Sequence, residues 1–111
     1  MGAPVVYFEI AGRDGPTMQR FYSTVFGWTT DTSRVPGYAY VATGSSEGIG
    51  GGIRQDPPDK ALYVRVPDLQ ASLDAIFANG GSVLVPLTVV PGVVTFALFR
   101  DPEGNVMGLM K

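Results

Sequence analysis

Glu9 is the acidic residue whose position in this sequence is best suited to chemistry. It lies in the middle of a short apolar and aromatic run, Val5–Ile10, which is typical of a β-strand. A half-buried carboxylate there needs a polar partner, and in apolar surroundings it binds a proton more tightly than in water. The other nine acidic residues fall at helix caps, turns, loops, a linker or a polar helix face. Glu9 is therefore a candidate general base, or an anchor for a cationic group.

The second half of the chain repeats this strand. The run around Glu9 aligns without a gap with Ala61–Val66, which matches Tyr7 to Tyr63 and Glu9 to Arg65. One interpretation is structural: Glu9 and Arg65 pair with each other or with backbone, and the tyrosines are ordinary amphipathic lining. The other is functional: the two tyrosines donate hydrogen bonds to a ligand oxygen, and Arg65 neutralises a carboxylate or enolate.

Strand and helix signals follow the same order in both halves. The first half has a strand at Val5–Ile10, a helix capped by Asp14 and ended by Gly27, and strands around Trp28–Thr32, Tyr38–Thr43 and Gly48–Arg54. The second has a strand at Ala61–Val66, a helix capped by Asp68 and ended by Asn79-Gly80-Gly81, and strands around Ser82–Val85, Val93–Arg100 and Asn105–Met110. This predicts one α+β domain of two βαβββ modules, residues 1–54 and 61–111, joined by a Pro-containing linker at 55–60.

Alternation along a strand assigns side chains to faces. The apolar residues Phe8 and Ile10 are expected to pack under the helices, so Tyr7 and Glu9 lie on the opposite face. The second module follows the same rule. The Gly50–Gly52 run lacks the Lys-Ser or Lys-Thr of a phosphate loop, and it indicates sheet curvature or the close approach of a ligand or partner chain.

Composition excludes several functions. The 111 residues contain no Cys and no His, which excludes thiolate nucleophiles, disulfides and histidine-based catalysis. Eight basic against ten acidic residues give a net charge of −2, without the basic surplus of a nucleic-acid binder. Signal-peptide features and an apolar run of the roughly 20 residues that span a bilayer are both missing. We therefore expect a cytoplasmic protein that binds neither nucleic acid nor membrane.

Two segments carry a family resemblance. Residues 20–28, RFYSTVFGW, resemble the end of the first helix in the glyoxalase, bleomycin-resistance and extradiol-dioxygenase (vicinal oxygen chelate) superfamily, and residues 101–109, DPEGNVMGL, resemble its closing hairpin. Residues 66–69 and 78–83 fit its second module. The resemblance implies a curved eight-stranded sheet around a ligand cavity, with the helices outside.

The resemblance also implies where a metal would be bound. Metal-using members place ligands on the first and last strands of each module. Those positions here carry Val5 or Tyr7, Ala61 or Tyr63, and Gly108 in place of the usual glutamate of the closing strand. A divalent cation needs three or four nitrogen or oxygen ligands, so we expect neither a metal nor another cofactor.

The function that we favour is a metal-independent protein that sequesters a small, partly aromatic molecule, as in the bleomycin-resistance branch. The alternative is a metal-independent lyase or isomerase-type enzyme, with Glu9 as general base and Tyr7 beside it, helped by Tyr63 and Arg65. A third interpretation is a structural or regulatory module that presents its sheet to a protein partner. The expected ligand-binding residues are Tyr7, Glu9, Arg54, Tyr63, Arg65 and Phe96. Exposed sheet edges favour a homodimer.

Overall fold

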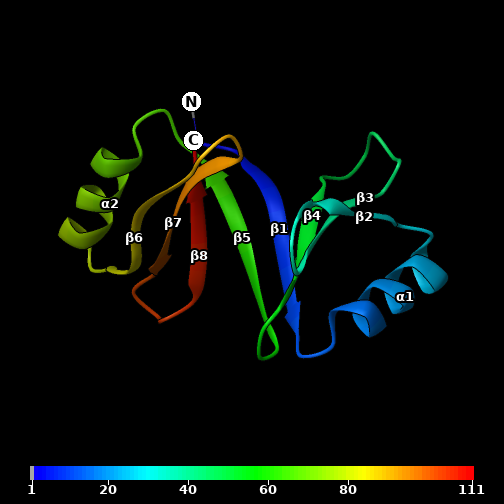
Figure 1. Ribbon diagram of the computed structural model, residues 1–111. Coiled ribbons are helices and arrows are strands. Elements are labelled where there is room, and N and C mark those ends of the chain that lie inside the picture. Colours follow the sequence, from blue (N-terminus) through cyan, green and yellow to red (C-terminus); the bar gives the residue numbers. More distant parts are fainter. Residues whose placement is uncertain (1) are drawn as a thin grey trace. The chain divides into compact units, whose positions relative to one another are not determined.

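The computed structural model describes residues 2–111 and divides into two compact units (Figure 1). The first unit is residues 7–61, and the second is residues 2–6 together with 62–111. The boundaries between the units fall inside the first strand of each module. None of the helices described in residues 2–111 is long and apolar enough to cross a membrane.

The first unit is built on four strands and one helix. Its elements are β1 (Val5–Gly12, from residue 7 onward), α1 (Gly15–Phe26), β2 (Thr29–Val35), β3 (Tyr38–Ala42) and β4 (Gly51–Gln55). The strand order is β2-β3-β4-β1, in which β1 and β4 run parallel and the other neighbours are antiparallel.

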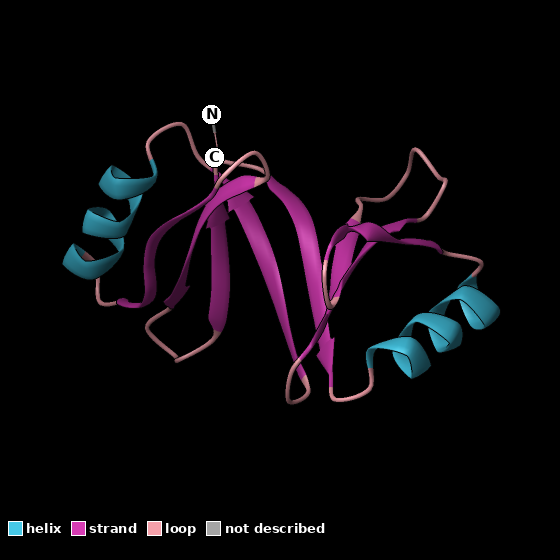
Figure 2. Ribbon diagram, viewed as in Figure 1, coloured by secondary structure: helices cyan, strands magenta, loops and turns pink. Residues whose placement is uncertain are grey.

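The second unit repeats this arrangement. Its elements are β5 (Asp59–Arg65, from residue 62 onward), α2 (Leu69–Ala78), β6 (Ser82–Val90), β7 (Val94–Arg100) and β8 (Val106–Met110), with the strand order β5-β8-β7-β6. Here β5 and β8 are the parallel pair. The eight sheet strands and two helices confirm the predicted α+β class and the βαβββ repeat (Figure 2).

Several predicted boundaries differ from those in the structure, most clearly at the linker and at the end of β6. Strands β4 and β5 extend into the predicted linker at 55–60, which leaves residues 56–58 between them. Strand β6 continues past Val85 to Val90 although it contains Pro86. Because β6 is an edge strand with a register shift between Val85 and Thr88, a residue without an N–H is tolerated there.

Both helices begin at the predicted caps. The side chain of Asp14 accepts a hydrogen bond from the Thr17 backbone N–H at 3.1 Å, and that of Asp68 accepts one from the Ala71 N–H at 3.0 Å. Gly27 ends α1 with a φ of 71°, a left-handed conformation that glycine adopts without strain. These local signals depend on a few neighbouring residues, which is why the sequence predicts them well.

Each helix packs on the apolar face of its own strands. The core of the first unit contains Ala39, Val41 and Ile53, with Phe8, Met18, Tyr22 and Trp28 packed against it. The core of the second unit contains Val66, Leu69, Leu73, Ala97 and Leu109, with Val64, Ile76 and Phe99 against it. Phe8 therefore lies under the helix, as alternation predicts. Phe99 does the same on β7, which places Phe96, three residues earlier on a regular strand, on the other face.

Gly51 allows Phe8 to lie against β4. These residues are paired across the parallel β1 and β4 strands, and a Cβ on Gly51 would clash with the Phe8 carbonyl oxygen and lie 2.6 Å from its ring. We expect Gly51→Ala to lower the free energy of unfolding by about 1–3 kcal/mol, since a packed core resists an added methyl group. Urea denaturation measures this. Gly48→Ala is the matched control, because a Cβ there would meet only Thr43 Oγ1 at 3.8 Å; an equal loss in both variants would contradict the steric explanation.

Candidate functional site

Four polar side chains of the first unit form a hydrogen-bonded network: Tyr7 and Glu9 from β1, Tyr38 from β3 and Arg54 from β4. The strand register places them together, because Tyr38 pairs with Arg54 across the antiparallel β3 and β4 strands. Phe8 lies between the two β1 residues in sequence and points into the core. The network therefore occupies the face of the sheet opposite α1, as strand alternation predicts for Tyr7 and Glu9.

Both carboxylate oxygens of Glu9 accept hydrogen bonds. Arg54 Nε donates to Oε1 at 2.8 Å, and the Tyr38 hydroxyl donates to Oε2 at 2.9 Å. The Glu9 side chain is only 13% exposed and that of Arg54 is 29% exposed, so water screens this ion pair incompletely. Within the first unit, Arg54 is thus a cation that pairs with Glu9.

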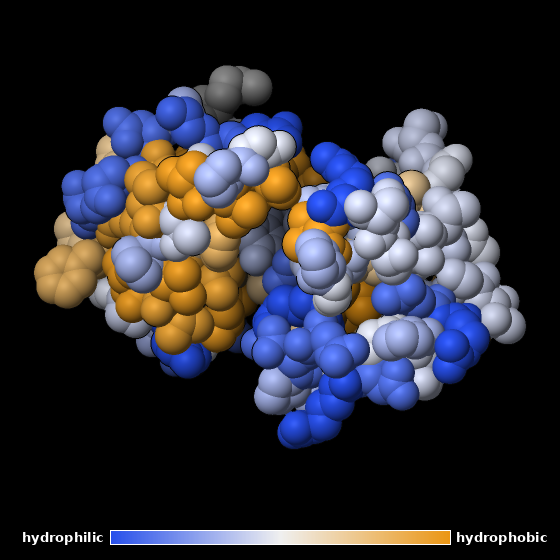
Figure 3. Space-filling view, in the orientation of Figure 1, coloured by the Kyte–Doolittle hydropathy of each residue, from blue (hydrophilic) through white to orange (hydrophobic). Residues whose placement is uncertain are grey.

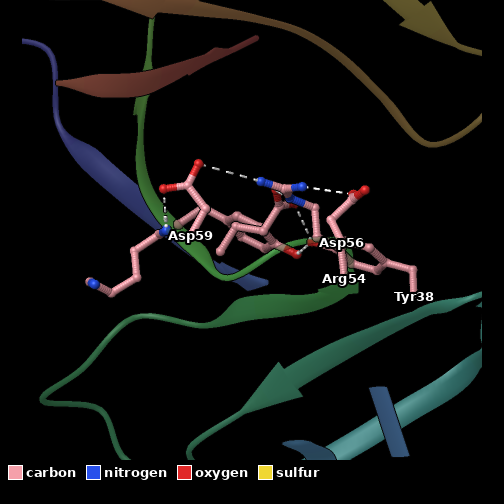
Figure 4. A network of polar contacts seen from close by, with 7 residues as sticks. Tyr38, Arg54, Asp56 and Asp59 are labelled. Carbon is pink, nitrogen blue, oxygen red and sulfur yellow. Dashed lines mark hydrogen bonds and ion pairs between the residues drawn. The ribbon is translucent and has the colours of Figure 1, made fainter. Parts of the chain in front are cut away.

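Arg54 is shared among three carboxylates. Besides Glu9, its Nη1 donates to Asp56 Oδ2 at 2.7 Å, and its Nη2 lies 3.9 Å from Asp59 Oδ2 (Figure 4). Desolvation by partial burial lowers the pKa of Arg54, but the bonds to Asp56 and Glu9 outweigh it and hold that pKa above its usual value. Its positive charge is therefore fully compensated within the first unit.

The two tyrosine hydroxyls form a directed chain. Tyr38 has one hydroxyl hydrogen and donates it to the carboxylate, so the 2.5 Å contact between Tyr7 and Tyr38 is donated by Tyr7. Burial raises the pKa of Tyr7 to about 12, with the Glu9 charge adding to the rise. The pKa of Tyr38 is also well above its usual value: burial is the largest cause, and the hydrogen bond with Tyr7 is the next. Both phenols stay protonated at neutral pH.

Gly52 leaves the space that these hydroxyls occupy. It lies opposite Glu9 on one side and Tyr40 on the other. A Cβ here would overlap the Tyr38 hydroxyl and lie 2.6 Å from the Tyr7 hydroxyl oxygen. The glycine run was predicted to mark sheet curvature or the close approach of a ligand or partner chain; at Gly52 the groups that approach are the chain's own tyrosines.

The remaining predicted site residues, Tyr63, Arg65 and Phe96, belong to the second unit. Tyr63 is buried, Phe96 is half-buried and Arg65 is exposed. The Tyr63 ring lies over Gly108, where a Cβ would come within 2.7 Å of the ring carbon Cγ. The position of the family's metal-binding glutamate is thus covered by an aromatic ring.

Sequence reasoning missed several contributors, of which Tyr38 is the most important. Tyr38 and Tyr40 alternate along a predicted strand, and this shared parity was the available signal. Their rings meet edge to face with centroids 5.1 Å apart. Asp56 and Asp59 were assigned to the linker and had no signal of their own, because their role depends on where Arg54 points.

The residues present do not fit the divalent metal ion of the metal-using members. Within residues 2–111, no group of three or more His, Cys, Asp or Glu side chains is placed to hold a metal ion. The three carboxylates that do converge, from Glu9, Asp56 and Asp59, meet on the Arg54 guanidinium. A cation is thus already supplied by the chain.

The sequence is similar to proteins that are named glyoxylases or glyoxylase-like. A glyoxylase-like domain-containing protein of Didymella fabae is 32% identical over 110 residues, which cover 87% of this chain and 84% of the relative. Glyoxylase CFP32 of Mycobacterium tuberculosis, a provisional name, is 27% identical over 113 residues, 93% of this chain but 43% of that protein. The chain therefore spans less than half the length of the mycobacterial relative. No protein-family model matches the sequence.

Solved structures show the same fold. Methylmalonyl-CoA epimerase from M. tuberculosis superposes with a TM-score of 0.70 at 17% identity, over 96% of this chain and 85% of that one. Hypothetical protein BH1468 from Bacillus halodurans gives 0.71 at 11% identity, over 99% and 94%. These structures show the fold, and the Didymella relative, which is 32% identical along most of both sequences, places the chain in the glyoxalase-like family of the vicinal oxygen chelate superfamily.

Proposed function

We propose that this chain is a metal-independent binding domain that sequesters a small, partly aromatic molecule. The observation that carries the proposal is the double engagement of Glu9, whose two oxygens are bonded by Arg54 and Tyr38. A general base must direct a lone pair at the substrate proton. A carboxylate held between a guanidinium and a phenol is better suited to fixing the position of its neighbours.

The chemistry of the surrounding side chains suits a ligand with both polar and aromatic parts. Tyr7 and Tyr38 supply neutral hydroxyl oxygens that can accept hydrogen bonds, because their hydrogens are donated within the network, and Tyr40 adds an aromatic ring on the same face. Ligand-binding roles for Tyr63, Arg65 and Phe96, in the second unit, are part of the same proposal.

The alternative is a metal-independent lyase or isomerase-type enzyme, with Glu9 as base and Tyr7, Tyr63 and Arg65 assisting. It is favoured by the names of the structural neighbours, several of which are methylmalonyl-CoA epimerases. An epimerase moves a proton at carbon. In this chain the proton would have to be taken by a second lone pair of a Glu9 oxygen, because each oxygen already accepts one hydrogen bond.

Retention of a metabolite separates the two functions. We expect native mass spectrometry after incubation with a cell extract to show a small molecule retained unchanged, with no metal in the mass. Glu9→Gln keeps the shape and one acceptor, so a binder of neutral or anionic ligands should retain the compound within a few-fold. An enzyme should instead convert it, and lose at least about a hundredfold in turnover in that variant. Glu47→Gln, an exposed loop position, is the control.

The raised tyrosine pKa values give a test of the network itself. Phenols protonate near pH 10 in the unfolded chain, and Tyr7 does so at about 12 in the folded protein. Its contribution to stability is therefore complete below pH 10 and is lost as the pH rises through about 12. We expect the urea midpoint to fall across this range, and to fall less steeply in Tyr7→Phe. Identical pH profiles for the two proteins would contradict the assigned network.

We further propose that the chain forms a homodimer through β6. This edge strand and the turn after it expose five large apolar side chains: Val83, Leu84, Leu87, Val89 and Val93. An apolar surface covers this part of the second unit (Figure 3). The mycobacterial relative is more than twice as long, which leaves room for a second domain of this size. Sedimentation equilibrium of the wild-type protein should give twice the chain mass of 11.8 kDa. The Leu87→Asp variant places a charge on the apolar surface and should give the mass of one chain. A wild-type protein that sediments as a monomer would refute the dimer.

A further inference from the structure

Arg34 is a second arginine associated with the site, and its surroundings differ from those of Arg54. Its guanidinium carbon lies 4.4 Å from the centroid of the Tyr40 ring, and that ring contacts Tyr38 of the network. Within residues 2–111 no carboxylate lies within ion-pair distance of Arg34, whereas Arg54 is paired with three. Arg34 is thus an exposed cation that makes no ion pair with any of the described residues.

An irregularity in β2 directs Arg34 onto the tyrosine. Asp31 pairs with Tyr40 and Val35 with Tyr38, so β2 has two more residues than β3 over this stretch. Val35 lies on the same face as its partner Tyr38. In a regular strand the preceding residue, Arg34, would therefore point to the other face, which is covered by the helix. The bulge turns it over Tyr40 instead, and bulges commonly re-aim side chains beside functional sites.

The bulge is held by a local hydrogen-bonded turn. Asp31 Oδ1 accepts bonds from the Ser33 backbone N–H at 2.9 Å and from the Ser33 hydroxyl at 2.6 Å. Both bonds lower the pKa of Asp31, and the bond from the Ser33 hydroxyl has the larger effect. The charge of Arg34 lowers this pKa by a smaller amount. The Asp31 carboxylate thus holds the turn, and the placement of Arg34 is built into the strand.

The guanidinium retains donors for a ligand. No described residue accepts a hydrogen bond from the Arg34 guanidinium, whose N–H groups form a planar fork that matches a carboxylate. The charge is also felt in the network: burial raises the pKa of Tyr7 to about 12, and Arg34 is among the weaker effects that oppose this rise.

We propose that Arg34 and Tyr40 form a subsite for the carboxylate of an aromatic carboxylic acid, with the edge of the guanidinium binding the carboxylate. This inference rests on the proposed binding function and specifies its ligand as an anion. Arg34 is then the residue that selects charge, and Tyr40 is the residue that positions it.

Benzoate and its neutral analogue benzamide test the subsite directly. In ¹⁵N-edited NMR titrations at low ionic strength, benzoate should shift signals of β2 and β3 and bind at least about tenfold more tightly than benzamide. Arg34→Gln should remove this preference, and Arg34→Lys should restore part of it, because lysine keeps the charge but not the planar fork. Arg20 is exposed on α1, which packs against the opposite face of the sheet. Arg20→Gln should therefore leave the preference for benzoate unchanged.

Three results would overturn the proposal: no shift at β2 and β3 with tens of millimolar benzoate, equal affinity for benzoate in Arg34→Gln, or displacement of benzoate by equimolar inorganic phosphate. Failure here is distinct from failure of the binding function. A protein that retains a metabolite with equal affinity in wild type and Arg34→Gln refutes the subsite alone. A benzoate preference that Arg34→Gln removes supports the subsite even where no metabolite from the extract is retained.

Discussion

The ion pair between Glu9 and Arg54 determines how the polar face of the first unit is organised. It joins neighbouring parallel strands, and its carboxylate is too little exposed for water to replace a lost partner at low cost. Removal of Arg54 would deprive the little-exposed Glu9 carboxylate of this cation, whereas removal of Glu9 would leave Arg54 paired with Asp56 and Asp59. The pair also fixes the direction of every further hydrogen bond, since a carboxylate that only accepts makes Tyr38 a donor to it and Tyr7 a donor to Tyr38.

The glycines of β4 make this arrangement sterically possible. Gly51 receives the Phe8 ring on the core face, and Gly52 receives the tyrosine hydroxyls on the other. Adjacent residues of a strand point to opposite faces. Two consecutive glycines therefore leave space for neighbouring side chains on both faces of the sheet at the same place. The hydrophobic core and the polar network therefore depend on the same short segment.

Much of the fold was predictable because its signals are local. The repeated strand, the caps at Asp14 and Asp68, and the burial of Phe8 all follow from spacing and alternation. The partner of Glu9 was not predictable, although Arg54 was singled out as a candidate for ligand binding. The internal repeat pointed to Arg65, whereas the ion pair with Arg54, 45 positions from Glu9, depends on the register of β1 against β4. The position of Arg34 over Tyr40 depends on a bulge that alternation cannot reveal.

The two units use the same steric device for different side chains. In each, a glycine on the last strand of the βαβββ repeat lies beneath a tyrosine: Gly52 under Tyr38 and Gly108 under Tyr63. A glutamate at Gly108, as in metal-using members of the superfamily, would require a Cβ where the Tyr63 ring now lies. The glutamate and the ring therefore exclude each other at this position. Exchange of Gly108 for a metal-binding residue would therefore have to be accompanied by the loss or movement of the Tyr63 ring.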